Sequence, residues 1–359
     1  MIPLQRRRIA LVGGAGFIGH NLALALAKRG AAVSIIDGLQ VNNLLAFASA
    51  DHDRPDRDLA LRIVNERLDL LRAADIPLYI QDARDEGALA HRLRDLQPQV
   101  LIHLAGLSHA QRSNEDPGSA FEHTLRTLES SLACARGEVE HFVFFSSSMV
   151  YGHFCEPTVT EDAPCNPLGI YGALKYAGEK MVIAHHQVFG MPYTIVRPSA
   201  LYGERCVSRR VVQVFVENAL QGADLIVHGD GSDRLDFTYI DDLVEGIVRV
   251  IQHEGARNDT FNMAFGCSRS IGELIEVLKV HFPPINVVFH RRGRLTPQRG
   301  TLSVAKARKQ IGYDPGYPLE RGLALYLDWY RTLDGLAAGR ARSPVATPAL
   351  VTTMLPCPA

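Results

Sequence analysis

Long apolar runs are missing from this sequence. No segment approaches the ~18 consecutive apolar residues that a membrane-spanning helix needs. The opening residues, MIPLQRRR, are basic but lack the apolar core and cleavage site of a signal peptide. Excess charge is missing too, because 38 Lys and Arg residues against 39 Asp and Glu residues leave a net charge of −1. We therefore expect a cytoplasmic protein that acts on a small molecule, with no nucleic acid and no membrane as partner.

The cysteines form no recognisable site. Six are scattered along the chain with no CxxC pair and no Cys/His cluster, which argues against a zinc site and against a disulfide scaffold. We expect no metal and a reduced compartment. The six are Cys134, Cys155, Cys165, Cys206, Cys267 and Cys357.

Length and composition favour a chain of two lobes without internal repeats. With 359 residues, 47% of them hydrophobic, the chain can bury a large core. We expect a dinucleotide-binding domain over residues 1–176. A substrate-binding lobe over 177–333 would return some segments to it. The Ala-, Pro- and Thr-rich composition of residues 334–359 predicts a disordered tail.

The most informative stretch is IALVGGAGFIGHNL, residues 9–22. Its apolar start predicts a buried strand, its glycines predict a tight turn, and Phe17–Lys28 is the expected helix. Glycines in such a turn supply positive φ, let a pyrophosphate approach the backbone and let the helix pack closely on the strand. The helix N-terminus then holds a phosphate. An ordinary strand-to-helix turn is the alternative. The glycines are Gly13, Gly14, Gly16 and Gly19.

An acidic residue follows at the spacing that a dinucleotide site requires. The predicted strand over residues 32–36 ends at Asp37, close to the offset of about 20 residues at which a carboxylate accepts the adenosine ribose hydroxyls. The same carboxylate would repel a 2′-phosphate. The pair of features therefore predicts NAD, in preference to NADP, as the cofactor.

Residues 41–76 form a long excursion before the next strand. After a polar stretch over 51–58, apolar residues recur at helical spacing, which predicts an amphipathic helix that covers the sheet. A helix that binds a partner is the alternative. The apolar positions are Leu61, Val64, Leu68 and Leu71.

The segment LYIQDARD predicts the third strand. Leu78 and Ile80 alternate along it, and Asp82 at its carboxyl end is placed to accept the adenine amino group. A surface turn carboxylate is the alternative for Asp82. A short helix is expected next, over residues 91–96.

A buried strand then runs into small residues in VLIHLAGLSHA, residues 100–110. Ligands of open parallel sheets bind at the carboxyl ends of the strands, so Ala105 and Gly106 would let the cofactor lie against the backbone. His103, inside the strand, is interpreted as a core histidine, whereas His109 is expected to face the cleft.

A helix over residues 121–134 and the strand of HFVFFSSSMVYG complete the pattern. That strand ends in three serines. Three strand–helix units in succession predict an α/β fold, a doubly wound parallel sheet of the Rossmann type with a smaller α/β lobe after it.

Three residues carry the expected chemistry. Tyr171 and Lys175 lie one turn apart on one face of the helical stretch YGALKYAGEKMV. Free tyrosine, with a pKa of about 10, is a poor base at pH 7, and the Lys175 ammonium and a positive nicotinamide ring would stabilise its phenolate. Ser147, at the end of a different strand, would hydrogen-bond the substrate oxygen. YxxxK alone usually marks an exposed helix face. Together with the glycine turn and Asp37, it indicates a catalytic site.

With these motifs, residues 8–332 resemble the extended short-chain dehydrogenase/reductase family. The resemblance is closest to its NAD-dependent nucleotide-sugar epimerases and dehydratases, the UDP-galactose 4-epimerases among them. The markers are VGGAGFIG, QDARD, HLAG, SSSMVYG, YGALK, VRPSALYG, HGDGSDRLDFTYIDD and IGYDP.

The resemblance implies a set of binding residues and partners. It places Ser147 in catalysis with Ser148 beside it at the substrate, and an arginine of the GDGxxR element, Arg234, at the diphosphate of a nucleoside diphosphate-sugar, with Arg299 near a second arginine position. A structural ion pair of Arg234 with Asp236 or Asp241 is the alternative. A homodimer is also expected. The expected NAD-binding residues are Gly13, Gly16, Phe17, Ile18, Gly19, Asp37, Asp82, Ala83, Leu104, Ala105, Gly106, Tyr171 and Lys175.

The residues beside Ser147 favour one reaction within the family. Dehydratases of the family resemble Thr-Asp-Glu-Val-Tyr-Gly there, and decarboxylases tend to keep the glutamate, whereas this chain has Ser148 and Met149. We therefore expect epimerisation at carbon 4 through a transient 4-keto sugar. A 4,6-dehydratase or a 4-keto reductase is the enzymatic alternative, and a non-catalytic NAD-binding regulatory protein is the alternative of another class. At Ser108, Thr124 and Ala200 the chain differs from the residues that the family often carries, so the identities of the sugar and of the nucleotide stay open.

Overall fold

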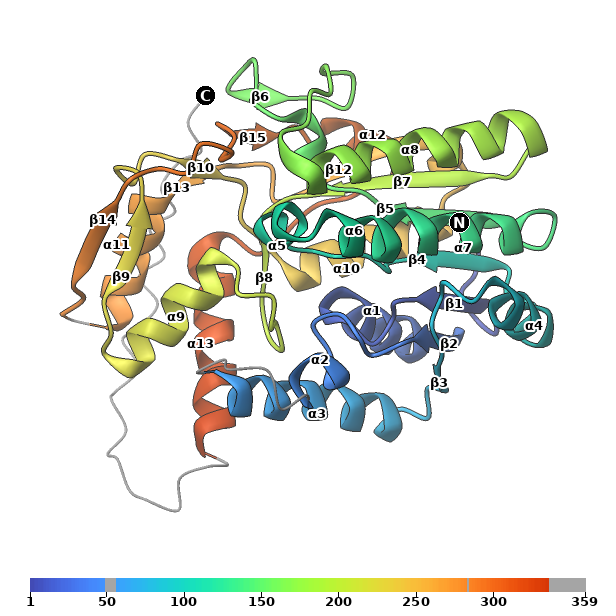
Figure 1. Ribbon diagram of the computed structural model, residues 1–359, viewed down its shortest axis with the longest axis horizontal. Coiled ribbons are helices and arrows are strands. Elements are labelled where there is room, and N and C mark those ends of the chain that lie inside the picture. The colour runs from blue at the N-terminus through green and yellow to red at the C-terminus, as the bar shows by residue number, and fades with distance from the viewer. Residues whose placement is uncertain (49–55, 283, 336–359) are drawn as a thin grey trace.

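The computed structural model describes residues 1–48, 56–282 and 284–335, and a seven-stranded parallel sheet lies at its centre (Figure 1). All of its strand pairings are parallel. The predicted doubly wound α/β fold is therefore confirmed. In spatial order the strands are β12 (Asp259–Met263), β7 (Tyr193–Pro198), β5 (His141–Phe145), β4 (Val100–His103), β1 (Arg8–Val12), β2 (Ala32–Asp37) and β3 (Leu78–Ile80).

Both faces of the sheet are buried under helices. Along β1, Ile9 and Leu11 point into one apolar core, and Ala10 and Val12 point into the other, as alternation along a strand requires. The first core lies against α1 (Phe17–Lys28), α3 (Arg57–Ala73) and α10 (Ile240–Gln252). The second core lies against α4 (Glu86–Leu96), α7 (Thr127–Ala135) and α8 (Gly169–Phe189).

The strand order reverses between β1 and β4, and this point positions the site. The chain continues from β1 to β2 and β3 on one side, while β4, β5, β7 and β12 follow on the other. Gly13 N donates to Ile36 O, and Ala105 N donates to Val12 O at 3.0 Å. The loops after β1 and β4 therefore meet at the switch point, where ligands of such sheets bind.

Three helical segments differ from the expected boundaries. The helix expected over residues 91–96 begins five residues earlier, because the Asp85 side chain caps it by accepting Ala88 N–H at 3.0 Å. The helix expected over 121–134 is interrupted by a π-helix, η1 (Glu122–Arg126), between α6 (Pro117–Phe121) and α7. The 41–76 excursion holds a short helix, α2 (Leu44–Ala48), in addition to α3, and residues 49–55 of its polar stretch lie outside the described residues.

The carboxyl-terminal half returns two strands, β7 and β12, and the helix α10 to the main sheet, and it also builds a smaller lobe. Of the residues expected to form a disordered tail, 334 and 335 belong to the helix α13 (Leu319–Gly335), and residues 336–359 lie outside the described ones. Among the described helices none is long and apolar enough to cross a membrane.

The remaining elements are small. The two-stranded pairs are β6 (Thr158–Val159) with β15 (Thr301–Leu302), β8 (Leu201–Tyr202) with β11 (Thr238–Tyr239), β9 (Leu225–His228) with β14 (Val287–His290), and β10 (Arg234–Leu235) with β13 (Arg269–Ser270). The helices are α5 (Ala110–Glu115), α9 (Val211–Gln221), α11 (Ile271–His281), α12 (Ala305–Ile311) and α13 (Leu319–Gly335), with 3-10 turns at Ser148–Tyr151 and Glu254–Ala256.

Candidate active site

A cavity opens at the switch point, over the carboxyl ends of β1, β2 and β4. The structure brings almost all of the expected NAD-binding residues of the first domain together there. Gly19, Tyr171 and Lys175 are the exceptions, because Gly19 packs inside the turn, and Tyr171 and Lys175 line a second cavity that adjoins this one. The expected residues that line it are Gly13, Gly16, Phe17, Ile18, Asp37, Asp82, Ala83, Leu104, Ala105 and Gly106.

The glycine turn fits a dinucleotide. A Cβ on Gly13, which has φ +78°, would lie 2.5 Å from Ala105 N, and a Cβ on Gly19 would lie 2.4 Å from Gly14 O. Both positions therefore require glycine for packing. Gly16, by contrast, has only Gly13 O near its missing Cβ, at 3.5 Å, and it caps the N-terminus of α1. The turn leaves open space where free N–H groups and the helix dipole attract a phosphate.

Asp37 holds the turn from the end of β2. Its Oδ2 accepts Ala15 N–H at 2.9 Å and its Oδ1 accepts Leu39 N–H at 2.7 Å. Burial raises the pKa of the carboxyl, and these two N–H groups oppose that rise. The carboxylate lines the cavity, so it remains available to ribose hydroxyls.

Replacing Asp37 with asparagine should weaken selection of NAD over NADP. The amide keeps an acceptor for the turn but loses the negative charge that repels a 2′-phosphate and accepts the ribose hydroxyls. Because hydrogen bonds to charged groups contribute about 1.5–3 kcal/mol, we expect the ratio of the two dissociation constants to fall by about 10- to 100-fold. Calorimetric titration with both cofactors measures it. A wild-type preference for NADP would contradict the role of Asp37.

Asp82 lines the same cavity but is already engaged. Arg84 Nη2 donates to its Oδ2 at 2.6 Å and Gln40 Nε2 donates to the same oxygen at 3.2 Å. These bonds, led by those from Arg84, lower the pKa of Asp82 to about 2. The carboxylate is therefore ionised and fixed beside Ala83, and its contact with adenine stays a prediction.

A second cavity adjoins the first and holds the expected chemistry. The two cavities share Ile18, Leu104, Gly106, Ser108 and Arg210. The expected residues that line the second cavity are Ser147, Ser148, Tyr171, Lys175, Arg299 and the cleft histidine, His109. A cofactor in the first cavity and a substrate in the second would thus meet at the shared wall.

The three residues expected to carry the chemistry are positioned by two elements. Tyr171 and Lys175 are in the first turns of α8, and Ser147 follows β5, where its Oγ accepts Met149 N–H at 3.2 Å. Lys175 Nζ donates to Phe145 O, two residues before Ser147, at 2.8 Å. This bond ties the lysine to the strand that presents the serine.

Lys175 is buried, at 5% exposed, and that burial affects its charge. Burial lowers the pKa of Lys175 to about 8, and the charge of Glu179 opposes the fall. The ammonium therefore stays largely protonated at neutral pH. It lies where it can stabilise a phenolate on Tyr171.

The two expected substrate arginines have different environments. Arg299 lines the second cavity, close enough to Tyr171 and Arg210 for their charges to act on it, and burial lowers its pKa to about 10. Arg234 is not among the lining residues. Its Nε donates to Ser268 Oγ at 3.1 Å, and its guanidinium also bonds Ser268 O and pairs with Glu273 at 3.5 Å.

The alternative of an ion pair between Arg234 and Asp236 or Asp241 is wrong. Asp236 instead accepts Gly266 N–H at 3.1 Å and Leu302 N–H at 3.0 Å, which binds three loops of the smaller lobe together. Its buried carboxyl is a structural acceptor of backbone N–H groups.

His103 is a core histidine, as expected. It is 1% exposed, its Nδ1 is 3.0 Å from Ser131 Oγ, and burial lowers its pKa to about 3. It stacks beside Phe142 and Phe144. It is therefore neutral and cannot serve as an acid at physiological pH.

Several residues that line the NAD cavity were not expected from the sequence. They come from the loop after β2, from α3, from η1 and α7, and from the segment after β8. For one of them, Arg67, the sequence does contain an indication, because this charged residue lies in the apolar stripe of α3 with Ile63, Val64 and Leu71. The unexpected residues are Ile36, Gly38, Gln40, Val41, Asn42, Arg67, Ser108, His123, Thr127, Val207, Ser208 and Arg210.

Comparison with known proteins agrees with this geometry. The sequence profile of the NAD dependent epimerase/dehydratase family matches residues 9–264, so the chain belongs to that family. The predicted resemblance is confirmed, and the cofactor is NAD. The chain is an enzyme of a family that acts on nucleotide sugars.

Individual relatives carry different activities. The chain is 29% identical to a dTDP-glucose 4,6-dehydratase of Xanthomonas campestris, over 90% of this chain and 92% of the relative. It is equally 29% identical to a UDP-glucose 4-epimerase of Mycolicibacterium smegmatis, over 90% and 98%. In fold it is similar to the UDP-glucuronic acid 4-epimerase of Bacillus cereus, solved with UDP-glucuronic acid and NAD, with a TM-score of 0.80, 24% identity and coverage of 90% and 99%.

Proposed function

We propose that the protein inverts carbon 4 of a nucleoside diphosphate-sugar through a transient 4-keto sugar. The observation that carries the proposal is the chemistry of the substrate cavity. Among the described residues that line it there is no aspartate and no glutamate, whereas it contains Ser147, Tyr171 and Lys175. The cavity thus offers the acid–base groups that support oxidation and reduction of an alcohol by NAD. It lacks the carboxyls that would direct the ketone toward dehydration or decarboxylation.

Each residue of the trio has a role. Tyr171 takes the proton of the carbon-4 hydroxyl and later returns it, and the Lys175 ammonium stabilises the phenolate. Ser147 Oγ hydrogen-bonds the carbon-4 oxygen. NAD, when bound, accepts the hydride from carbon 4 and gives it back. Inversion requires the ketone to present its other face before the hydride returns, and a cavity lined by small side chains such as Gly106, Ser108 and Ala200 leaves space for that.

Elimination of water across carbons 5 and 6 needs more groups than the cavity offers. A base must remove the proton on carbon 5 and an acid must protonate the leaving hydroxyl. In this cavity Ser148 and Met149 are neutral, and the arginines stay protonated. His109 alone would have to do both tasks, since Tyr171 and Lys175 serve the oxidation at carbon 4.

The cationic side chains of the cavity support a diphosphate substrate. Arg210, Arg294 and Arg299 line it and form no ion pair with a described carboxylate, whereas Arg209 pairs with Asp56 at 2.9 Å. Unpaired guanidinium groups that face a cavity favour a phosphate ligand. For Arg234 we keep the proposal of a diphosphate contact only as a consequence of the family resemblance, because its donors are engaged by Ser268 and Glu273.

A 4,6-dehydratase is the second candidate, because one of the 29% identical relatives has that activity. Incubation with UDP-glucose, UDP-N-acetylglucosamine, UDP-glucuronate and their GDP, CDP and dTDP counterparts, followed by NMR, separates the two. We expect an equilibrium mixture of carbon-4 epimers from one of these sugars, and purified protein that already carries NAD.

Other products would overturn the assignment. A 4-keto-6-deoxy sugar indicates dehydration, release of carbon dioxide indicates decarboxylation, and net consumption of NADH indicates a reductase. A protein that binds NAD and converts none of these sugars would favour the regulatory alternative. The Tyr171→Phe protein is the negative control for each reaction.

We also propose that the enzyme is a homodimer. Phe121 on α6 and Val188 and Phe189 on α8 are apolar side chains with 49%, 70% and 47% of their surface exposed. Large apolar side chains exposed on adjoining helices support an interface that covers them.

A further inference from the structure

Arg67 is a charged side chain inside the wall of the NAD cavity. It is on α3, the helix of the 41–76 excursion, and 0% of its surface is exposed. It lines the cavity with Phe17, which begins the helix after the glycine turn, and with Asn42, from the loop after β2. The excursion therefore contributes a side chain to the cofactor cavity in addition to covering the sheet.

The hydrogen-bond acceptors of this guanidinium are all neutral backbone carbonyls. Nε and Nη2 of Arg67 both donate to Arg205 O, Nε at 2.8 Å, and Nη1 is 3.4 Å from Asn42 O. Carbonyls satisfy donors without cancelling a charge. Among the residues that the structure describes, no carboxylate forms an ion pair with Arg67.

The charge of Arg67 is present at neutral pH and forms no ion pair with a described carboxylate. Burial lowers the pKa of Arg67 to about 10, which still leaves it protonated. Asp37 acts on it only through space, because the Asp37 oxygens accept the N–H groups of Ala15 and Leu39. A buried charge without a counter-ion is costly. The cavity wall thus favours a ligand that brings negative charge.

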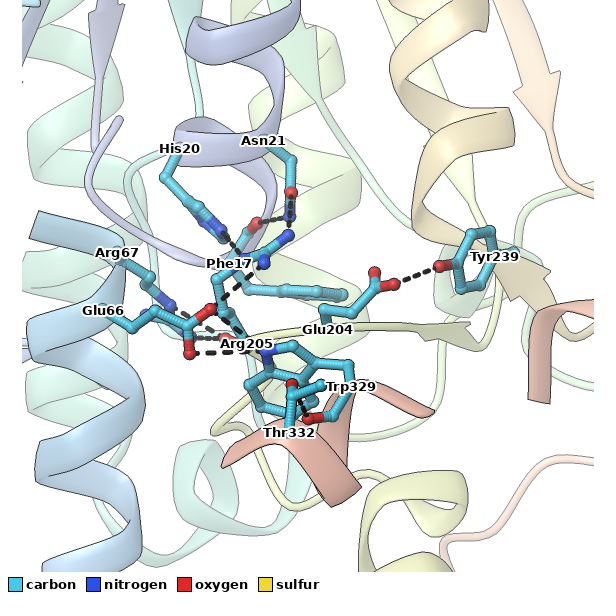
Figure 2. Close-up of polar contacts among 10 residues, drawn as sticks. All are labelled: Phe17, His20, Asn21, Glu66, Arg67, Glu204, Arg205, Tyr239, Trp329 and Thr332. Carbon is cyan, nitrogen blue, oxygen red and sulfur yellow. Dashed lines mark hydrogen bonds and ion pairs between the residues drawn. The ribbon is translucent and has the colours of Figure 1, made fainter. Parts of the chain in front are cut away.

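The carbonyl that holds Arg67 is itself fixed to the helix after the glycine turn (Figure 2). Arg205 Nε donates to His20 Nε2 at 3.0 Å, and Arg205 Nη2 donates to Asn21 Oδ1 at 3.2 Å. Because His20 accepts at Nε2, its proton is on Nδ1, which donates to Gly16 O at 2.9 Å. This chain of bonds sets the position of Arg67 relative to the phosphate-binding turn.

Glu66, the residue before Arg67 on α3, also holds the side chain of Arg205. Glu66 Oε1 lies 3.3 Å from Arg205 Nη1 and accepts Trp329 Nε1–H at 3.0 Å, from α13 (Figure 2). Arg62, one turn earlier, donates to Leu333 O of α13 and is absent from the cavity wall. The guanidinium of Arg67 is therefore held in place before any ligand arrives, which lowers the ordering cost of binding.

We propose that the charge of Arg67, held within the cavity wall, stabilises the diphosphate of NAD, so that the 41–76 excursion is part of the cofactor site. The two phosphates are the negative charges of NAD, and they belong at the first turn of α1, whose Phe17 and Ile18 line the cavity with Arg67. Neutralising a preset buried cation strengthens binding, and NAD that stays bound suits an enzyme that returns its hydride within one turnover. The proposal depends on NAD as the cofactor and not on which sugar reaction follows.

The test measures NAD binding without any sugar. Arg67→Gln removes the charge but keeps an amide donor for Arg205 O. Because a buried positive charge near the phosphates is lost, we expect NAD and ADP to bind about 10- to 100-fold more weakly, and adenosine to bind as to the wild type. Arg67→Lys, which restores charge without the planar fork, should recover part of the affinity for ADP. Calorimetry on protein stripped of NAD supplies the constants.

Arg62→Gln is the matched control, because it makes the same change on the same helix outside the cavity. It should leave the affinities for NAD, ADP and adenosine unchanged. Each variant is also melted with and without NAD, and the rise in Tm on adding NAD should shrink in Arg67→Gln alone.

Three results would overturn the proposal. Unchanged ADP affinity in Arg67→Gln, with only a lower Tm of the stripped protein, would show that Arg67 is a structural link between loops. Equal losses for adenosine and ADP would place its contact on the nucleoside. A loss confined to NADP would place it at the 2′ position. Should Arg67→Gln fail to fold, Arg67→Met decides in the same assays, and wild-type affinity of that variant for both NAD and ADP would contradict the role of the charge.

Discussion

Replacing Tyr171 with phenylalanine is expected to lower turnover of the nucleotide sugar by about 10²- to 10⁴-fold, the contribution of a positioned acid–base group. The ring stays packed at the start of α8, so the fold should be intact. What disappears is the hydroxyl proposed to exchange a proton with the oxygen on carbon 4, beside Lys175, whose Nζ donates to Phe145 O at 2.8 Å. Initial rates of epimer formation, followed by NMR on the sugar that the wild type converts, measure the loss.

Tyr176→Phe is the matched control. Tyr176 is on the same helix but packs against the core and lines neither cavity, with Lys180 Nζ 4.9 Å from its ring centre. Its variant should keep wild-type turnover, and circular dichroism should show the same spectrum for both variants. Near-native turnover by Tyr171→Phe would remove the tyrosine from the mechanism and leave the proton transfer to another group.

The parts of the site that follow from short stretches of sequence could be predicted. The glycine turn, Asp37 at the end of the next strand, and Tyr171 one helical turn from Lys175 all depend on local geometry, which residue spacing determines. The carboxyl ends of parallel strands lie on one edge, so Gly106 and Ser147 could be placed in one cleft from the order of the strands.

The parts built by contacts between distant segments could not be predicted. Val207, Ser208 and Arg210 reach the NAD cavity from a loop in the second half of the chain, and no local pattern states where that loop folds back. Arg67 depends on a carbonyl 138 residues away. Its place in an apolar stripe shows only that the charge is buried.

Contacts that the sequence pattern does not reveal explain the other differences between the expected and the observed structure. The GDGxxR element points to Arg234, yet Ser268 and Glu273 take its donors, because β10 pairs with β13 and brings these residues beside it. The early start of α4 has a local cause, the cap by Asp85, which apolar spacing does not reveal. The π-helix that places His123 on the cavity wall depends on packing against its neighbours.

A buried ion pair holds α8 to β7 and, through Ser146, to the end of β5. Arg197 Nε and Nη2 donate to the two oxygens of Glu179 at 2.9 and 2.7 Å, and their side chains are only 7% and 2% exposed. Ser146 Oγ donates to Glu179 at 2.5 Å, and Arg197 Nη1 donates to Tyr151 OH at 2.9 Å. Although burial alone would lower the pKa of Arg197, Glu179 raises it, so the guanidinium is charged. Ser146 lies between the carbonyl that holds Lys175 and the catalytic serine.

Replacing Arg197 with methionine should lower the free energy of unfolding by about 3–5 kcal/mol, because it leaves a buried carboxylate without its partner. The Tyr151 hydroxyl loses a donor at the same time, while its bond to Asn262 Oδ1 at 2.8 Å remains. Since native proteins are stable by only about 5–15 kcal/mol, the loss is a large part of the total. Urea unfolding with NAD held at one saturating concentration measures it, so that ligand binding contributes equally to each variant.

Arg331→Met is the matched control, because Arg331 pairs with Asp328 at 2.6 Å while both side chains are about half exposed, at 48% and 63%. Solvent screens that pair, so its loss should change the free energy of unfolding by less than about 0.5 kcal/mol.

A second variant separates charge from packing: adding Glu179→Leu to Arg197→Met removes the unpaired carboxylate and should recover part of the stability, since an apolar pair can replace a buried ion pair. If the double variant is no more stable than Arg197→Met alone, the loss came from packing around Arg197. If Arg197→Met costs no more than Arg331→Met, the pair does not hold α8 to β7.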